Sequence, residues 1–218
     1  LFWLSLALVV YTYVGYGLII YIMGRFFGKN NPPVTPPDSE LPEITLLVAA
    51  YNEESYIVQK IENSLSLDYP ASKLHLWIVA DGSTDRTVEF CQKYPTVTVF
   101  YSPGRKGKIH AVNRVMQEVK TPVVIFSDAN TDLNTNALKN IVRHFTDPNV
   151  GGVAGEKRIV SLTQDNASGS GEGLYWKYES ALKMLDSKFT TAIGAAGELF
   201  AVRTELYINP HTDTIIED

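Results

Sequence analysis

Apolar segments of strand length alternate with amphipathic segments of helix length through the middle of this chain. The apolar segments predict strands at residues 43–50, 74–80, 97–102 and 122–128. A helical pattern follows each strand; after the first, Ile57, Ile61 and Leu65 recur at the spacing of one helix face. Strands and helices that alternate in this way form a mostly parallel sheet with helices on both faces. The pattern therefore predicts an α/β fold.

The alternation is weaker after residue 150. Residues 150–160 and 194–203 predict two further strands, residues 163–173 a loop, and residues 174–186 an amphipathic helix. The region from residue 43 to residue 218 is long enough for one domain with a substantial core. We therefore expect a single α/β domain over residues 43–218.

The first 23 residues, from Leu1 to Met23, contain no charged side chain. As a helix they would span about 35 Å, at roughly 1.5 Å per residue, which is enough to cross the apolar core of a bilayer. A signal peptide and a buried helix of a soluble protein are the alternatives, but the apolar region of a signal peptide is usually only about 7–15 residues long. We predict one transmembrane helix over residues 1–24, ahead of the α/β domain.

Arg25 and Lys29 follow the apolar segment directly. Because positively charged residues beside a membrane helix stay on the cytoplasmic side, we expect a location at the cell membrane with the α/β domain in the cytoplasm. Residues 25–42 contain five prolines and no apolar periodicity, which predicts an extended linker.

The overall charge argues against one class of partner. The chain has 19 basic and 24 acidic side chains, a formal net charge of −5. Domains that bind nucleic acid usually carry a basic surface, so we expect no nucleic-acid partner. Cys91 is the only cysteine, which rules out a disulfide within this sequence.

Polar side chains follow three of the four predicted strands. They lie at residues 51–53, 81–83 and 128–130, and each group contains a carboxylate. Ligands of an open parallel sheet bind outside the carboxyl ends of its strands. These three groups therefore predict a ligand site at one edge of the sheet.

Helix capping is a simpler explanation for such residues. Asn52, Ser83 or Thr84, and Asn134 are residue types that cap helices, and each precedes a predicted helix. Capping accounts well for one such group. It does not account for carboxylates at three separate strand ends, so we favour the ligand site.

A glycine-rich basic segment, "PGRKGKIHAVN", lies between the third strand and its helix. Gly104 and Gly107 allow close backbone approach, and Arg105, Lys106 and Lys108 place positive charge before a helix N-terminus, which predicts a phosphate site. A solvated basic loop is the alternative. The segment is not a Walker A loop, which needs four residues between its glycines, and no GxGxxG follows the first strand. Aspartates beside a phosphate site favour a divalent cation, Mg²⁺ or Mn²⁺.

In this order, the segments resemble family 2 glycosyltransferases of the GT-A fold, the nucleotide-diphospho-sugar transferase fold. The resemblance is to the membrane-embedded branch that includes cellulose, hyaluronan and poly-N-acetylglucosamine synthases. The segments that carry it are "VAAYNEE", "VADGSTDRT", "GRKGKIHAVN", "FSDAN", "GAAGELFAVR" and "IIED". Together they cover residues 43–218.

The resemblance implies roles for the matching positions on the donor side. The residues that would bind the nucleotide sugar are Tyr51, Glu53, Asp81, Lys108 and Asp128. Among them, Asp81 would contact the uracil or ribose, and Lys108 would lie near the diphosphate. Asp128 and Asn130 occupy the metal-binding positions for Mg²⁺ or Mn²⁺.

The resemblance also implies the catalytic base and the acceptor side. Asp218 matches the aspartate that acts as general base. The acceptor side would be formed by Gly194, Ala195, Ala196, Gly197 and Glu198. The reaction implied is inverting transfer of a sugar from a UDP-sugar to an acceptor hydroxyl, in the synthesis of a β-linked polysaccharide.

Two departures from the family pattern keep other functions open. Asn130 stands where the family has a second acidic residue, and the QxxRW motif and later membrane helices of the family are not in this sequence, which implies a C-terminally truncated domain. One alternative is a non-processive enzyme that glycosylates a lipid or a small acceptor. Another is a membrane-anchored nucleotide-binding module that has lost catalysis.

Overall fold

The computed structural model describes residues 1–28, 33–156, 167–192, 194–195, 197–211 and 214, and of residues 167–174 it describes the backbone alone. Internal contacts divide the chain into two compact units. The helical unit comprises residues 1–32 and 156–194, and the sheet unit comprises residues 33–155 and 195–218.

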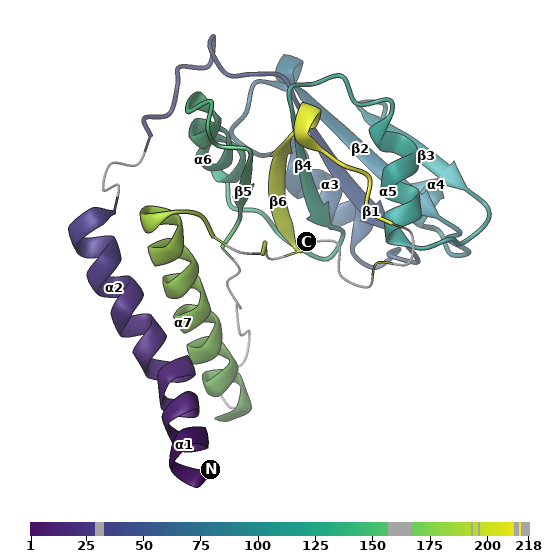
Figure 1. Cartoon of the computed structure of the whole chain (residues 1–218). Coiled ribbons are helices and arrows are strands. Elements are labelled where there is room, and N and C mark those ends of the chain that lie inside the picture. Colours follow the sequence, from purple (N-terminus) through teal and green to yellow (C-terminus); the bar gives the residue numbers. More distant parts are fainter. Residues whose placement is uncertain (29–32, 157–166, 193, 196, 212–213, 215–218) are drawn as a thin grey trace. The chain divides into compact units, whose positions relative to one another are not determined.

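The sheet unit contains six strands in the order β3-β2-β1-β4-β6-β5 (Figure 1). They are β1 Ile44–Ala50, β2 Leu74–Asp81, β3 Val97–Ser102, β4 Val123–Asp128, β5 Gly152–Ala154 and β6 Leu199–Arg203. The first four strands run parallel to their neighbours, whereas β6 runs antiparallel to both β4 and β5. The predicted mostly parallel sheet is confirmed.

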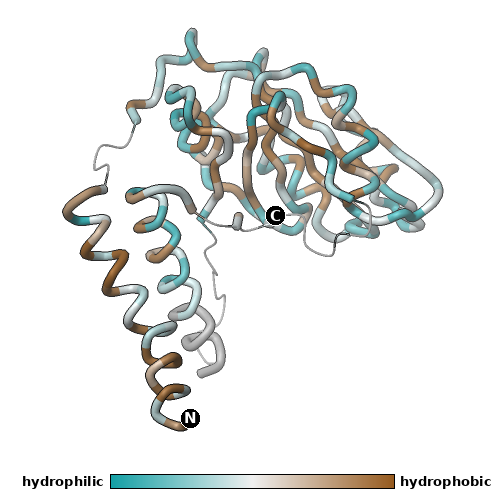
Figure 2. The backbone as a smooth tube through the Cα atoms, viewed as in Figure 1, coloured by the Kyte–Doolittle hydropathy of each residue, from teal (hydrophilic) through white to brown (hydrophobic). Residues whose placement is uncertain are grey.

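Helices pack on both faces of this sheet, as the alternation predicts. They are α3 Ile57–Leu65, α4 Thr87–Cys91, α5 Lys108–Met116 and α6 Ala137–Val142. Because successive strand residues point to opposite faces, Leu46 packs in the core with α3, α4 and α6, while Leu47 packs in the core with α5. Figure 2 shows the apolar residues concentrated in the strands and along the inner faces of these helices.

The predicted helix caps are wrong. The helices α3, α4 and α6 begin after Tyr56, Arg86 and Asn136, and none of these three residues makes a side-chain capping hydrogen bond. The residues predicted as caps, Asn52, Ser83, Thr84 and Asn134, precede those positions by two or more residues. Two of the loops that contain them bond to each other instead, as described below.

The helical unit contains α1 Phe2–Val10, a π-helical turn Tyr11–Gly15, α2 Tyr16–Phe27 and α7 Ala167–Phe189. Residues Phe2–Phe27 form a helix that is long and apolar enough to cross a membrane, by length and composition. Helix α7 packs beside α2, and the Tyr16 hydroxyl donates to Asp186 Oδ1 at 2.6 Å. The predicted loop at 163–173 is wrong for residues 167–173, which are helical, because helix propensity is only a weak determinant of structure.

Candidate functional site

A pocket of about 340 Å³ lies where the parallel strands β1, β2 and β4 end. Because these strands run in one direction, the loops that follow them reach the same edge of the sheet. All six residues predicted to bind the nucleotide sugar or the metal line this pocket: Tyr51, Glu53, Asp81, Lys108, Asp128 and Asn130. The structure therefore brings together side chains from four separate loops, while their roles in binding stay predictions.

Asp81 is the last residue of β2, and its side chain is only 5% exposed. Its Oδ2 accepts hydrogen bonds from the backbone N–H groups of Lys106 and Gly107, at 2.7 and 2.9 Å. Its Oδ1 is buried and finds no hydrogen-bond partner within the part of the chain that the structure describes. A buried carboxylate oxygen without a donor is energetically costly, so this atom is suited to accept an N–H or O–H from a ligand.

The basic loop between β3 and α5 lies directly against this carboxylate. Two backbone amides of the segment predicted as a phosphate site, those of Lys106 and Gly107, donate to Asp81 in this structure. The loop approaches Gly82 so closely that a Cβ there would lie 2.7 Å from the backbone nitrogen of Arg105. Gly82 also has a φ of +69°, which disfavours other residues.

Arg105 makes a contact that the sequence reasoning missed. Its guanidinium lies 3.8 Å from the centroid of the Tyr51 ring, and both residues line the pocket. In the sequence, Arg105 was counted only as one of several positive charges in a basic segment. Its partner follows a different strand, so the sequence alone contains no indication of this pair.

The loop after β1, residues 51–54, is bonded to the loop after β2, residues 81–87; we call these the paired loops. Asn52 adopts a φ of 54°, and its Oδ1 accepts a hydrogen bond from the Thr84 N–H at 2.8 Å. In return, the Asn52 N–H donates to Ser83 Oγ at 3.2 Å. The residues predicted as helix caps therefore hold the two loops together.

Asp85 and Thr87 complete the bonding between the paired loops. Thr87 is fully buried; its Oγ1 accepts from the Glu53 N–H at 2.8 Å and donates to Asp85 Oδ1 at 2.6 Å. Asp85 Oδ2 accepts from the Glu54 N–H at 3.1 Å. Partial burial raises the pKa of Asp85, but the hydrogen bonds from Thr87 and from the Glu54 amide outweigh it and lower that pKa overall.

Asp128 ends β4 and faces charged groups from two other loops. The Lys108 ammonium lies 3.1 Å from Asp128 Oδ1. Partial burial, with the nearby carboxylates of Asp128 and Asp85, raises the pKa of Glu53. Negative charge is therefore concentrated on this side of the pocket, where a cation would be stabilised.

The predicted metal ligands fit a cation that is shared with a substrate. Among the described residues, no group of three or more His, Cys, Asp or Glu side chains is placed to hold a metal ion. Mg²⁺, however, commonly takes one or two carboxylates from the protein and completes its coordination with phosphate and water. The Asp128 carboxylate and the Asn130 amide, which line the pocket together, meet that requirement.

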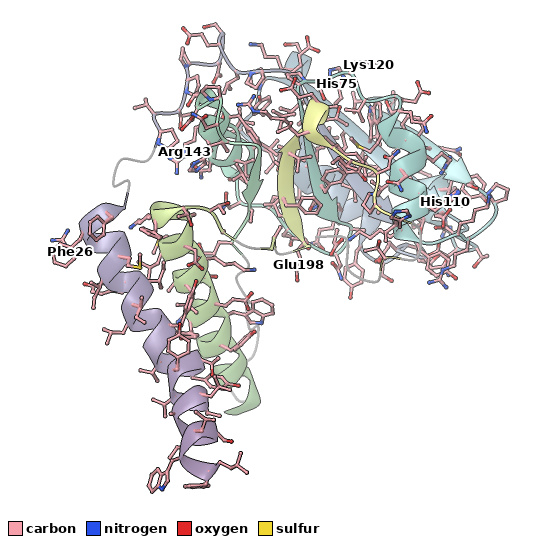
Figure 3. All side chains as sticks on the ribbon, in the orientation of Figure 1. Phe26, His75, His110, Lys120, Arg143 and Glu198 are labelled. Atoms are coloured by element: carbon pink, nitrogen blue, oxygen red, sulfur yellow. The ribbon has the colours of Figure 1, made fainter. Side chains whose placement is uncertain are left out.

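The residues predicted on the acceptor side precede β6. Gly194, Ala195, Gly197 and Glu198 are described, and none of the four is among the residues that line the pocket. The Glu198 carbonyl accepts from the Asp128 N–H at 3.3 Å, which places this segment beside the end of β4 (Figure 3). Ala196 and Asp218 lie outside the described residues.

Lys60 is a second residue that the sequence reasoning missed. It belongs to α3, is only 1% exposed, and donates hydrogen bonds to Ser127 Oγ at 2.7 Å and to the Thr131 carbonyl at 2.6 Å. Burial lowers the pKa of this ammonium to about 8, although the nearby carboxylates of Asp132 and Asp128 act in the opposite direction. The sequence did contain an indication, because Lys60 interrupts the apolar face of α3 between Ile57 and Ile61.

Comparison with known proteins shows that this chain is similar to glycosyltransferases. Residues 45–208 match the family described as Glycosyl transferase family 2. A β-monoglucosyldiacylglycerol synthase from Synechocystis sp. is 32% identical over 142 residues, 61% of this chain and 30% of that protein. A poly-β-1,6-N-acetyl-D-glucosamine synthase from Staphylococcus aureus is 30% identical over 154 residues, 69% of this chain and 37% of that protein. The chain thus spans well under half the length of these relatives.

A solved structure shares the architecture. The mannosyltransferase PcManGT from Pyrobaculum calidifontis, in complex with GDP-Man and Mn²⁺, superposes with a TM-score of 0.70 at 27% sequence identity. The similarity covers 93% of this chain and 56% of that protein. With the six-stranded sheet described above, it confirms the GT-A fold that the sequence predicts.

Proposed function

Because the chain belongs to glycosyl transferase family 2, we propose that it is the donor-binding part of an inverting glycosyltransferase that uses a UDP-sugar. The sugar would pass to an acceptor hydroxyl, in the synthesis of a β-linked polysaccharide. The chain covers only part of the relatives that it matches, so the proposal concerns the full-length protein that contains it.

The observation that carries the proposal is the state of the Asp81 carboxylate. One oxygen holds the β3–α5 loop, and the other is buried in the pocket wall without a donor among the described residues. The ring N–H of uracil is a donor that would satisfy this oxygen; adenine and cytosine lack a ring N–H on their pairing edge and could donate there only from an amino group. Guanine also has a ring N–H, so GDP is the nucleotide that a test must exclude.

The part of the pocket that contains Lys108, Asp128 and Asn130 is suited to bind a diphosphate next to the base. Lys108 supplies a positive charge, and Asp128 and Asn130 would hold Mg²⁺ or Mn²⁺. The bound cation would neutralise charge that develops on the leaving diphosphate. The PcManGT relative, whose structure contains GDP-Man and Mn²⁺, supports a divalent cation as the cofactor.

For the transfer itself we propose Asp218 as the general base, and residues 194–198 as the wall of the acceptor site. The base would remove a proton from the acceptor hydroxyl, which then attacks the anomeric carbon from the face opposite the leaving group. A single displacement inverts the configuration, so an α-linked donor gives a β-linked product.

A lipid acceptor is the second candidate. The Synechocystis relative is named for a glycolipid, β-monoglucosyldiacylglycerol, and the Staphylococcus relative is named for a polysaccharide. The apolar helix Phe2–Phe27 suits both, because a transmembrane helix there would keep the pocket near lipids, with the sheet unit in the cytoplasm. The product of the reaction distinguishes the two.

The test is to express the full-length protein in membranes and supply a panel of UDP-sugars, and GDP-mannose, with Mn²⁺. We expect UDP release from one UDP-sugar, abolished by a chelator, with a product that mass spectrometry identifies as a polymer or a glycolipid. An Asp218→Asn variant should bind donor and lose transfer. Release of GDP from GDP-mannose, with no release of UDP from any UDP-sugar, would contradict the proposal. Turnover by the Asp218→Asn variant would also contradict it.

A further inference from the structure

Lys60 is the largest side chain that is fully buried within the described part of the chain. Its neighbours on the same face of α3, Ile57 and Ile61, are 0% exposed and apolar. Burying an ammonium is costly, and apolar side chains of similar volume often serve at least as well in a core. Stability alone therefore does not explain a lysine at this position.

The contacts of Lys60 are concentrated on one turn of the chain. We call residues 127–131, which follow the body of β4, the β4 turn. The ammonium donates to Ser127 Oγ at one end of this turn and to the Thr131 carbonyl at its other end. Between these two contacts lie Asp128 and Asn130, the proposed metal ligands. The buried ammonium of Lys60 therefore bonds to both ends of the turn that contains the proposed metal ligands.

The contact with Ser127 extends to the chain that enters β6. Ser127 Oγ, which accepts from Lys60, donates in turn to the Glu198 carbonyl at 3.1 Å. The same carbonyl accepts from the Asp128 N–H at 3.3 Å. The position of Glu198, on the proposed acceptor side, is thus connected to Lys60 through one hydroxyl.

We propose that Lys60 is a positioning residue: its ammonium holds the β4 turn so that Asp128 and Asn130 can bind a divalent cation with the donor. This inference rests on the proposed function, and it names the residue on which that site depends. Lys60 is not among the residues that line the pocket, so it acts through the turn and not by touching the ligand.

The test compares Lys60→Met with Ser64→Ala in the full-length protein. Methionine keeps the length and volume of the side chain and removes the ammonium. Ser64 is 0% exposed, lies one helical turn further along α3, and its hydroxyl finds no partner in the described part of the chain, so Ser64→Ala is a matched control for a buried polar change. Ser127→Ala, which removes one of the two Lys60 contacts, is a milder second variant.

Calorimetric titration with UDP and Mn²⁺ is the first readout. Loss of a group that orients metal ligands typically weakens metal binding by about 10-fold to 100-fold. We expect a loss of that size in Lys60→Met, a smaller loss in Ser127→Ala, and wild-type affinity in Ser64→Ala. Equal affinity in Lys60→Met and wild type overturns the inference.

Amide hydrogen exchange of residues 128–133 without ligand is the second readout. The amides of this segment should exchange faster in Lys60→Met than in the wild type, and at the wild-type rate in Ser64→Ala. Equal exchange rates in Lys60→Met and wild type overturn the inference, and this outcome does not depend on which ligand the protein binds. If the wild-type protein binds no UDP, the proposed function is contradicted. Faster exchange of residues 128–133 in Lys60→Met would still support the role of Lys60 in holding the turn.

Discussion

The paired loops and the β4 turn form neighbouring parts of one pocket, yet different forces hold them in place. The paired loops bond to each other through short polar side chains that range from the exposed Asn52 to the fully buried Thr87. The β4 turn is held from α3 by the buried ammonium of Lys60, and Leu133, just beyond the turn, is held by the amide of Asn63, which bonds to both its N–H and its carbonyl. In the first arrangement two loops hold each other, whereas the second depends on side chains of a helix that lies beneath the turn.

This difference suggests separate tasks for the two regions. Loops that bond mainly to each other would hold the nucleotide base of the proposed donor without fixing the rest of the site. A turn that contributes ligands to a cation must hold its oxygen atoms at set distances, and a bonded, buried group beneath it meets that need. The predictions below test whether the two regions can be perturbed independently.

The largest effect is expected for Asp81→Ala. The substitution removes the acceptor that we propose for the base and also leaves the Lys106 and Gly107 amides without their partner. A hydrogen bond to a charged group contributes about 1.5–3 kcal/mol, so UDP affinity should fall about 10-fold to 100-fold in a calorimetric titration. Hydrogen exchange in residues 128–133 should stay unchanged; a faster rate there would show that the two regions are coupled.

A smaller effect, on stability, is expected for Thr87→Val. The change keeps the shape of a fully buried side chain but removes the oxygen that accepts from the Glu53 N–H. A buried donor left without a partner costs about 1–3 kcal/mol, so the free energy of unfolding in denaturant should fall by that amount. Thr98→Val is the control, because Thr98 is exposed on β3 and should change stability by less than about 0.5 kcal/mol. Equal effects of both changes would remove Thr87 from the bonding of the paired loops.

The smallest effect is a pH dependence that involves Asp85. Its pKa is lowered in the folded protein, so its contribution to stability is present above the unfolded pKa, about 3.9, and is lost as the pH falls through the folded value. Between pH 7 and pH 3, the free energy of unfolding should fall less steeply in Asp85→Asn than in the wild type. Parallel curves would mean that this carboxylate does not favour its charged form in the folded state.

The sequence predicts the first four strands well, because apolar periodicity within one segment determines where a strand begins and ends, whereas β6 begins five residues later than the strand expected at 194–203. The strands β1 to β4 lie within one residue of the expected bounds at each end. The location of the pocket is also predictable, since carboxylates that follow parallel strands must meet at one edge. Both inferences need only local pattern and general topology.

Contacts between distant segments are not predictable in the same way. Asn52 and Ser83 have the chemistry of helix caps, and only the folded chain shows that they bond to each other. The Arg105–Tyr51 contact requires that two loops from different strands meet. Lys60 could have been noticed as a charge on an apolar helix face, but its partners at residues 127 and 131 could not have been identified.

The direction of β6 brings two kinds of segment to the edge of the sheet where the pocket lies. Segments that follow β1, β2 and β4 leave the sheet at this edge, whereas the segment that contains Glu198 enters the sheet there, because β6 runs opposite to β4. The bonds from Ser127 and Asp128 reach this segment only at the Glu198 carbonyl, so the side chains before Glu198 can change without altering where β1, β2 and β4 leave the sheet. If residues 194–198 form the acceptor side, as proposed, a new acceptor preference can arise while the proposed recognition of the nucleotide stays intact.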